Sequence, residues 1–418
     1  MKKSLLVILV LIPVQSFGWS RHNRITEIAI DSMIEVRAQK VLVTDFSDVE
    51  KNAAYILQDL KALRDAKYQD LDAFDPKLTF NENIKINKNY KFQANATSPN
   101  TNFQDMIGMQ VSAADVLIKY ADEPDWTMDQ LLFGADQYPQ IYKAQYAYMG
   151  GADSNDPIPT QAFRHMFWES WSLPHLFETF KIPVSRSPAG QAPDRAGLFL
   201  ALSRRAKELH LDYWSLRFLA NSLHYLEDVS QPYHSTQTAT KYFMFMGAFD
   251  PKSEGPFVKL ATYSSVVQHV LTYYHFAFED YMALLIEKYY ADPNSTPEAK
   301  VLVTALGVQS KDDSQIVDPN QDLYARVLAM SSMAVAEASK AGRASLKFFP
   351  QIPEKFISFD GTAANKFMDA NFWSAVFKTG EGDSEGKKEY YEVVKDMYIP
   401  LGAEIRTVVK SSLNYELL

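Results

Sequence analysis

Histidine and carboxylate residues at helical spacing are the features of this sequence that could do chemistry. His224 and Asp228 stand four residues apart, so on a helix their side chains share one face. Pro232 is expected to stop that helix, and the turn after it brings His234 back beside the same end. Imidazole and carboxylate groups without a thiolate are the ligands expected of catalytic zinc. The segment 224–234 therefore predicts a metal site.

His275 and Glu279 form a second histidine–carboxylate pair with the same spacing of four residues. A single pair of this kind is usually a surface pair, or a buried histidine whose hydrogen bonds are already made. Two pairs, with His234 just past a proline, favour a metal site over that structural interpretation.

The elements that must position these ligands are predicted from the spacing of apolar residues. Alternating strand patterns bounded by turns are scarce, and the polar stretches 81–101 and 187–194 are expected to be surface loops. The sequence therefore predicts an all-α fold, a single helical domain around the metal site. Apolar spacings of three and four predict helices over 26–36, 48–65, 103–121, 128–133, 196–209, 215–229, 264–289, 321–348 and 387–413.

Segment 242–256 lies between His234 and His275 and begins with an aromatic and methionine-rich run. It must leave and return near the predicted site. Two interpretations follow: an apolar flap that touches lipid or covers a substrate, or the buried end of an insertion.

The start of the chain has the pattern of a secretory signal. Two lysines precede the apolar run Leu5–Val14, and small residues follow at Ser16 and Gly18. We therefore expect a signal peptide over 1–18, cleavage between Gly18 and Trp19, and a secreted or periplasmic protein.

Composition narrows the classes of function. Apolar residues make up 47% of the 418 residues, which is enough to build a core without disulfides. The chain has no cysteine, so every thiolate mechanism and every cysteine zinc finger is excluded. The formal charge of −9 argues weakly against bulk electrostatic attraction to nucleic acid.

The pattern His224-xxx-Asp228-xxxxx-His234, with its Asp-Val-x-Gln-Pro-x-His ending, resembles the superfamily of zinc-dependent phospholipases C and single-strand nucleases. Members are mostly helical and exported, and they use three zinc ions to hydrolyse phosphate esters. The resemblance is specific over 215–235 and good over 275–279. It also covers the mature start and the region 153–165.

The resemblance implies further ligands outside the two helical pairs. It implies that the amine and carbonyl of Trp19 chelate one zinc, and that an aspartate and a histidine between the mature start and the first pair hold another. Asp153 matches that aspartate, with Asp156 as the alternative, and His165 is preferred over His175. The implied sets are Asp153, His165, His224 and Asp228 for one ion, His234, His275 and Glu279 for a second, and Trp19 and His22, sharing Asp228, for a third.

The resemblance also implies the reaction. Asp153 would orient or deprotonate the attacking water, and hydrolysis of a phospholipid would give diacylglycerol and a phosphorylated head group. Glu279 resembles the phospholipases, because the nucleases tend to have aspartate there. The expected partner is thus a phospholipid or membrane surface. The alternatives are a single-strand nuclease, which would take nucleic acid, and a non-catalytic helical zinc protein.

Two parts of the chain have no assigned role. The stretch of sequence between Trp19 and Asp153 is longer than the corresponding stretch in the family, which predicts an insertion over about 35–150. Residues from about 300 to 418 are expected to form a helical C-terminal extension.

Overall fold

The protein is described by a computed structural model that covers residues 21–45, 47–56, 107–124, 165–167, 170–172, 181–183, 192–236, 256–294, 297–307, 313–319, 321–350 and 385–413. The described residues are mostly α-helical, which confirms the predicted all-α class. Several predictions lie outside the described residues, among them the signal peptide 1–18, Trp19, Asp153 with its alternative Asp156, and residues 242–255 of the segment 242–256.

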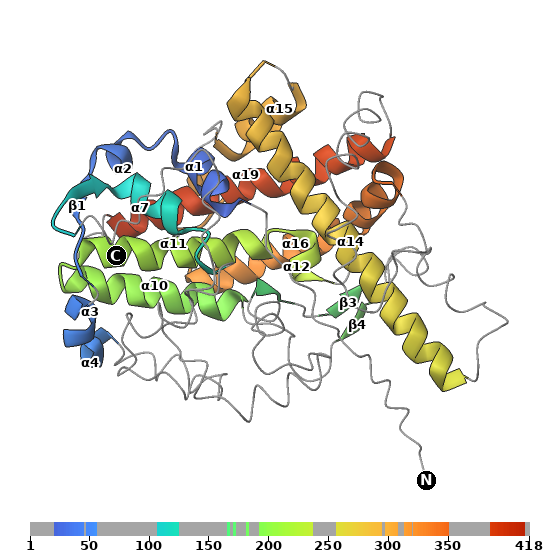
Figure 1. Cartoon of the computed structure of the whole chain (residues 1–418), viewed down its shortest axis with the longest axis horizontal. Coiled ribbons are helices and arrows are strands. Elements are labelled where there is room, and N and C mark those ends of the chain that lie inside the picture. Colours follow the sequence, from blue (N-terminus) through green and yellow to red (C-terminus); the bar gives the residue numbers. More distant parts are fainter. Residues whose placement is uncertain are drawn as a thin grey trace, which may run out of the picture.

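The centre of the fold is the helix α11 (Asp212–Val229), which is buried from Tyr213 onwards. Apolar and aromatic side chains occur on every side of this helix, as expected for a helix surrounded by protein. α10 (Ala192–Glu208) lies beside it as the other arm of a helical hairpin (Figure 1). His210 in the connecting turn has a φ of 58°, which lets the chain reverse direction.

Helices from both ends of the chain pack around α11. α1 (His22–Ile30) and α7 (Ala113–Tyr120) come from the N-terminal part. α16 (Leu323–Phe348) and α19 (Glu385–Leu413) come from the C-terminal part. In Figure 1, α1 in blue lies against α19 in red, so the described start and end of the chain meet.

The remaining helices connect or cover this group. α14 (Pro256–Ala291) is the longest of them, and the end that begins with Pro256 projects beyond the other helices (Figure 1). Within the described residues, none of the helices has the length and apolarity needed to cross a membrane. The shorter ones are α2 (Ile34–Ala38), α3 (Ser47–Lys51), α4 (Ala53–Ile56), α12 (Pro232–Ser235), α15 (Pro297–Gly307) and the 3₁₀ turn η7 (Asp313–Gln315).

Within the part of the chain that the structure describes, two small antiparallel strand pairs were not expected from the sequence. β1 (Lys40–Leu42) pairs with β2 (Gln110–Ser112), with Val41 opposite Val111. β3 (Ser170–Ser172) pairs with β4 (Lys181–Pro183). Three residues are too few to show an alternating pattern in a sequence, so these strands could be found only from their pairing.

Several predicted helix boundaries were wrong. The helix expected over 26–36 is two helices, α1 and α2, and α1 begins four residues earlier, at His22. The helix expected over 103–121 begins only at Ala113, after strand β2. Residues 192–194, expected in a loop, form the first turn of α10, and α15 lies mostly within the region that was expected to be helical from about residue 300. The predicted helix 128–133 and residues 57–65 lie outside the described residues.

Arg406 of α19 links elements that are far apart in the sequence. Its guanidinium is 1% exposed and donates to both carboxylate oxygens of Asp313, at 2.9 to 3.2 Å. It also donates to the carbonyl oxygens of Ala29 and Leu306. The two carbonyls lie near the ends of α1 and α15, so one side chain joins both helices to α19.

The close approach of α15 and α19 requires a residue without a side chain at position 402, where the sequence has Gly402. A Cβ atom at this position would lie 2.0 Å from the carbonyl oxygen of Leu306, so Gly402→Ala must push the helices apart. We expect the free energy of unfolding to fall by about 1–3 kcal/mol, the usual cost of overpacking. Urea denaturation of the purified variant measures this change.

Gly197 in α10 provides the matched control. A Cβ atom there meets nothing within 4 Å. Gly197→Ala is therefore expected to raise the free energy of unfolding by about 0.5–1 kcal/mol, because alanine loses less backbone entropy in a helix. Equal losses of stability in the two variants would contradict this account of Gly402.

Candidate metal centre

The C-terminal end of α11 and the short helix α12 carry the first predicted ligands. α11 ends at Val229, and the side chain of Gln231 accepts a hydrogen bond from the backbone N–H of Tyr233. Pro232 occupies the first turn of α12, a favoured position because its missing N–H is not needed there. The helix ends before Pro232, as expected, and Pro232 also begins a second helix. The result places His234 Nδ1 3.7 Å from Asp228 Oδ1.

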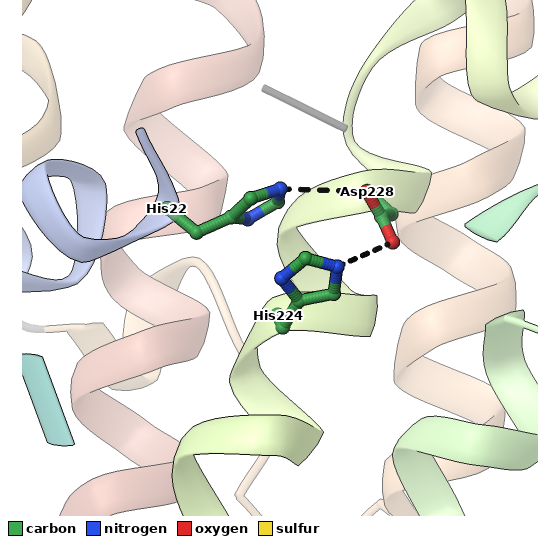
Figure 2. Close-up of side chains that lie close together, drawn as sticks. All are labelled: His22, His224 and Asp228. Atoms are coloured by element: carbon green, nitrogen blue, oxygen red, sulfur yellow. Dashed lines mark ion pairs between the residues drawn. The ribbon is translucent and has the colours of Figure 1, made fainter. Parts of the chain in front are cut away.

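His22, His224 and Asp228 form the first group of side chains that could hold a metal ion. Their ligand atoms all lie within 4.8 Å of one another. His224 Nε2 is 3.3 Å from one oxygen of Asp228, and His22 Nε2 is 3.6 Å from the other. Figure 2 shows the side chain from α1 and the two from α11 converging from separate helices. All three are completely buried.

His234, His275 and Glu279 form the second group, and their ligand atoms also lie within 4.8 Å of one another. Glu279 Oε1 is 2.5 Å from His275 Nε2 and 3.1 Å from His234 Nε2. The pair at spacing four on α14 therefore faces the histidine of α12, as the sequence predicted. The same carboxylate oxygen accepts a hydrogen bond from Gln231 Nε2 at 2.9 Å.

His165 lies between the two groups. Its Nδ1 is 2.8 Å from Asp228 Oδ2 and 2.9 Å from His224 Nε2. Its backbone carbonyl accepts the hydrogen bond of His234 Nδ1, at 2.6 Å. The structure thus places His165 with His224 and Asp228, the set implied by the resemblance. The fourth member of that set, Asp153, and the N-terminal Trp19 lie outside the described residues.

Three imidazoles have hydrogen-bond partners on the side away from the centre. Two of the partner residues, Glu227 and Ala121, were not identified from the sequence. His22 Nδ1 is 2.6 Å from Glu227 Oε2, and His224 Nδ1 is 2.7 Å from the carbonyl oxygen of Ala121. His234 Nδ1 donates to the carbonyl of His165. A carbonyl or carboxylate oxygen can only accept, so these Nδ1 atoms carry the hydrogen and each Nε2 directs its lone pair at the centre. Metal-binding histidines are usually oriented in this way.

The end of α7 is the support behind the first group. The carbonyl of Ala121 orients His224, and Asp122 Oδ1 accepts the backbone N–H of Asn23, the residue after His22. The carboxylate of the next residue, Glu123, accepts hydrogen bonds from Arg217 and Asn221 of α11, all of them buried. These residues belong to the predicted insertion 35–150, so this part of it contacts the centre directly.

Burial sets the charge state of the ligands. It is the main cause that lowers the pKa of His22 well below the usual value, and His224 and His234 add to the effect. Burial also lowers the pKa of His275, again with a smaller contribution from His234. Both imidazoles are therefore neutral at pH 7, which is the form that binds metal.

The donor set fits divalent metal ions. Neutral imidazole nitrogens and carboxylate oxygens are borderline to hard ligands that suit zinc and similar ions. Asp228 and Glu279 are both fully buried, and removing a carboxylate from water is costly unless positive charge compensates it. Cations at the two groups would supply that charge. Among the described residues, these two groups are thus the ones that could hold metal ions.

Comparisons with protein-family models, with curated proteins and with solved structures gave no match to this chain.

The lowered pKa values predict how the metal-free protein responds to acid. An imidazole in the unfolded chain has a pKa of about 6.5, so below that pH the unfolded state takes up protons that folded His22 and His275 do not. The contribution of these two histidines to the free energy of unfolding is therefore fully present above about pH 6.5. Below that pH it decreases, by at most about 1.4 kcal/mol per pH unit for each imidazole. Urea denaturation in chelator at about pH 7.5 and about pH 5.5 measures the difference.

The double variant His22→Gln, His275→Gln is the control for this pH dependence. Glutamine does not titrate, so the loss of stability between the two pH values should be smaller than in the parent protein. An identical loss in parent and variant would show that other groups cause the acid sensitivity.

Proposed function

We propose that this protein is a secreted zinc-dependent phosphodiester hydrolase of the phospholipase C type. The observation that carries the proposal is the position of Asp228 between imidazoles that approach both of its oxygens. Its Oδ1 lies 3.6 Å from His22 Nε2, and its Oδ2 lies 3.3 Å from His224 Nε2. Such a carboxylate can serve neighbouring cations at once, which is the arrangement that hydrolysis of a phosphate ester needs.

The residues have separate tasks in this proposal. Bound zinc ions would lower the pKa of water and neutralise charge on the phosphate. His22, His224 and His234 hold their Nε2 atoms in fixed directions through the partners on Nδ1. His275 and Glu279 complete the second group from α14. Trp19 is proposed as a further ligand, and Asp153 as the group that orients or deprotonates the attacking water.

A phospholipid is the favoured substrate because of Glu279. The carboxylate of the second group is a glutamate, as in the phospholipases that the sequence resembles, whereas the related nucleases tend to have aspartate. Cleavage on the glycerol side of the phosphodiester would release diacylglycerol and a phosphorylated head group. A single-strand nuclease would use the same ligands on a different substrate, and substrate assays separate the two.

The deciding experiment uses the mature protein with an intact Trp19 start. Bound zinc is measured, and the protein is tested in parallel on phosphatidylcholine and on single-stranded DNA. Zinc together with diacylglycerol release supports the proposal. Cleavage of DNA alone would move the function to the nuclease branch. Stoichiometric zinc without either activity would favour a non-catalytic zinc protein, and the absence of zinc would remove the basis of the proposal.

Substitution of His224 or Asp228 by alanine is expected to remove metal and activity together. Both side chains lie in the first group, and Asp228 also contacts the second. We expect kcat/KM to fall by at least about a hundredfold, as when the metal that generates the nucleophile is lost. Metal analysis and the phospholipid assay, run on the same preparations, test this expectation.

His210→Asn is the matched control for these substitutions. His210 is an exposed imidazole in the turn between α10 and α11, and asparagine tolerates its positive φ. This variant should keep its metal and its activity. Activity retained by His224→Ala or by Asp228→Ala would refute the assignment of the centre.

A further inference from the structure

The two ligand groups differ in the charge of the partner behind them. In the first group, His22 Nδ1 is hydrogen-bonded to the carboxylate of Glu227, at 2.6 Å. In the second group, the side chain behind Glu279 is the neutral amide of Gln231, which donates to Glu279 Oε1 at 2.9 Å. One group is therefore backed by an anion, and the other by a neutral donor.

Glu227 is held rigidly between two helices. It precedes Asp228 on α11, and its side chain reaches α1. Its Oε2 accepts the hydrogen bond of His22, and its Oε1 accepts that of the Thr26 hydroxyl at 2.7 Å. His22 and Thr26 are four residues apart on α1, so they present both donors on one face. All four side chains are completely buried.

These partners change the strength of the ligands in opposite directions. A carboxylate that accepts from Nδ1–H increases the electron density at Nε2, so the imidazole of His22 becomes a stronger ligand. Its negative charge in a buried site also attracts a cation. The amide of Gln231 instead donates to the oxygen of Glu279 that faces His234 and His275, which reduces the charge that this oxygen offers to a metal.

We propose that Glu227 is a positioning residue that makes the His22–His224–Asp228 group the tighter of the two sites, so that divalent cations occupy this group first. The inference rests on the proposed metal centre and is independent of which phosphodiester is cleaved. Glu227 acts through His22. It selects the tautomer and fixes the orientation of the ring, and its negative charge strengthens cation binding at this group.

The test is a metal titration of the full-length mature protein, made metal-free and followed with Co²⁺ by its visible absorption. The parent protein should bind in separable phases. His22→Ala should remove the tighter phase and His275→Ala the weaker phase, which assigns each phase to its group. In Glu227→Gln we expect the affinity of the tighter phase to fall by about 10–100-fold, the usual effect of losing an outer partner, with the weaker phase unchanged.

Glu404→Gln is the matched control. Glu404 is a buried carboxylate on α19 that faces Arg326, so the variant makes the same chemical change away from the centre. Both phases should stay at their parent affinities. If Glu227→Gln leaves the tighter phase unchanged, or weakens both phases equally, the proposal is wrong.

Thr26→Val keeps the proposal testable if Glu227→Gln does not fold. It removes the donor to Glu227 Oε1 and leaves the carboxylate and His22 in place. A selective loss of a few fold in the tighter phase is expected, and an unchanged phase would count against the proposal. A parent protein that binds no divalent cation would refute the metal centre as well. Normal binding without phosphodiesterase activity would refute only the proposed function.

Discussion

The fold must offset the cost of removing the carboxylate of Asp228 from water. Four imidazoles, those of His22, His165, His224 and His234, lie within 3.7 Å of its oxygens. They come from α1, from the segment 165–167, from α11 and from α12. A buried anion is tolerated only where compensating groups are held in place, so this one side chain requires four parts of the chain to meet. The helices around α11 are arranged to satisfy that requirement.

Buried arginine pairs secure the helices that deliver these ligands. Arg217 binds Glu123 behind His224, and Arg406 binds Asp313 while holding the last turn of α1. In each pair, a bidentate guanidinium balances a carboxylate within the protein. At the centre, imidazoles face the carboxylates instead. Neutral imidazoles offer hydrogen bonds but no positive charge, so in the proposed metal centre a cation would supply the charge that each arginine pair already contains.

Local spacing predicted the parts of the centre that depend on one helix. The pairs His224–Asp228 and His275–Glu279 follow from a period of 3.6 residues, and α11 and α14 carry them as expected. The start of α1 was missed because its first turn has no strong apolar pattern. Glu227 could not be paired from sequence, since its partner lies 205 residues away in the chain. The same holds for the carbonyl of Ala121, because any residue type can supply a backbone acceptor.

The contact between Arg406 and Ala29 has a consequence for the order of folding. The two residues are 377 positions apart, and Arg406 belongs to the last described helix. A growing chain that has not yet produced α19 lacks the donor that holds the end of α1, the helix that begins with His22. Contacts of such long range form late, because the chain must first lose the entropy of a very large loop. His22, which lies near the start of the chain, is thus among the last residues of the candidate centre to be fixed in place.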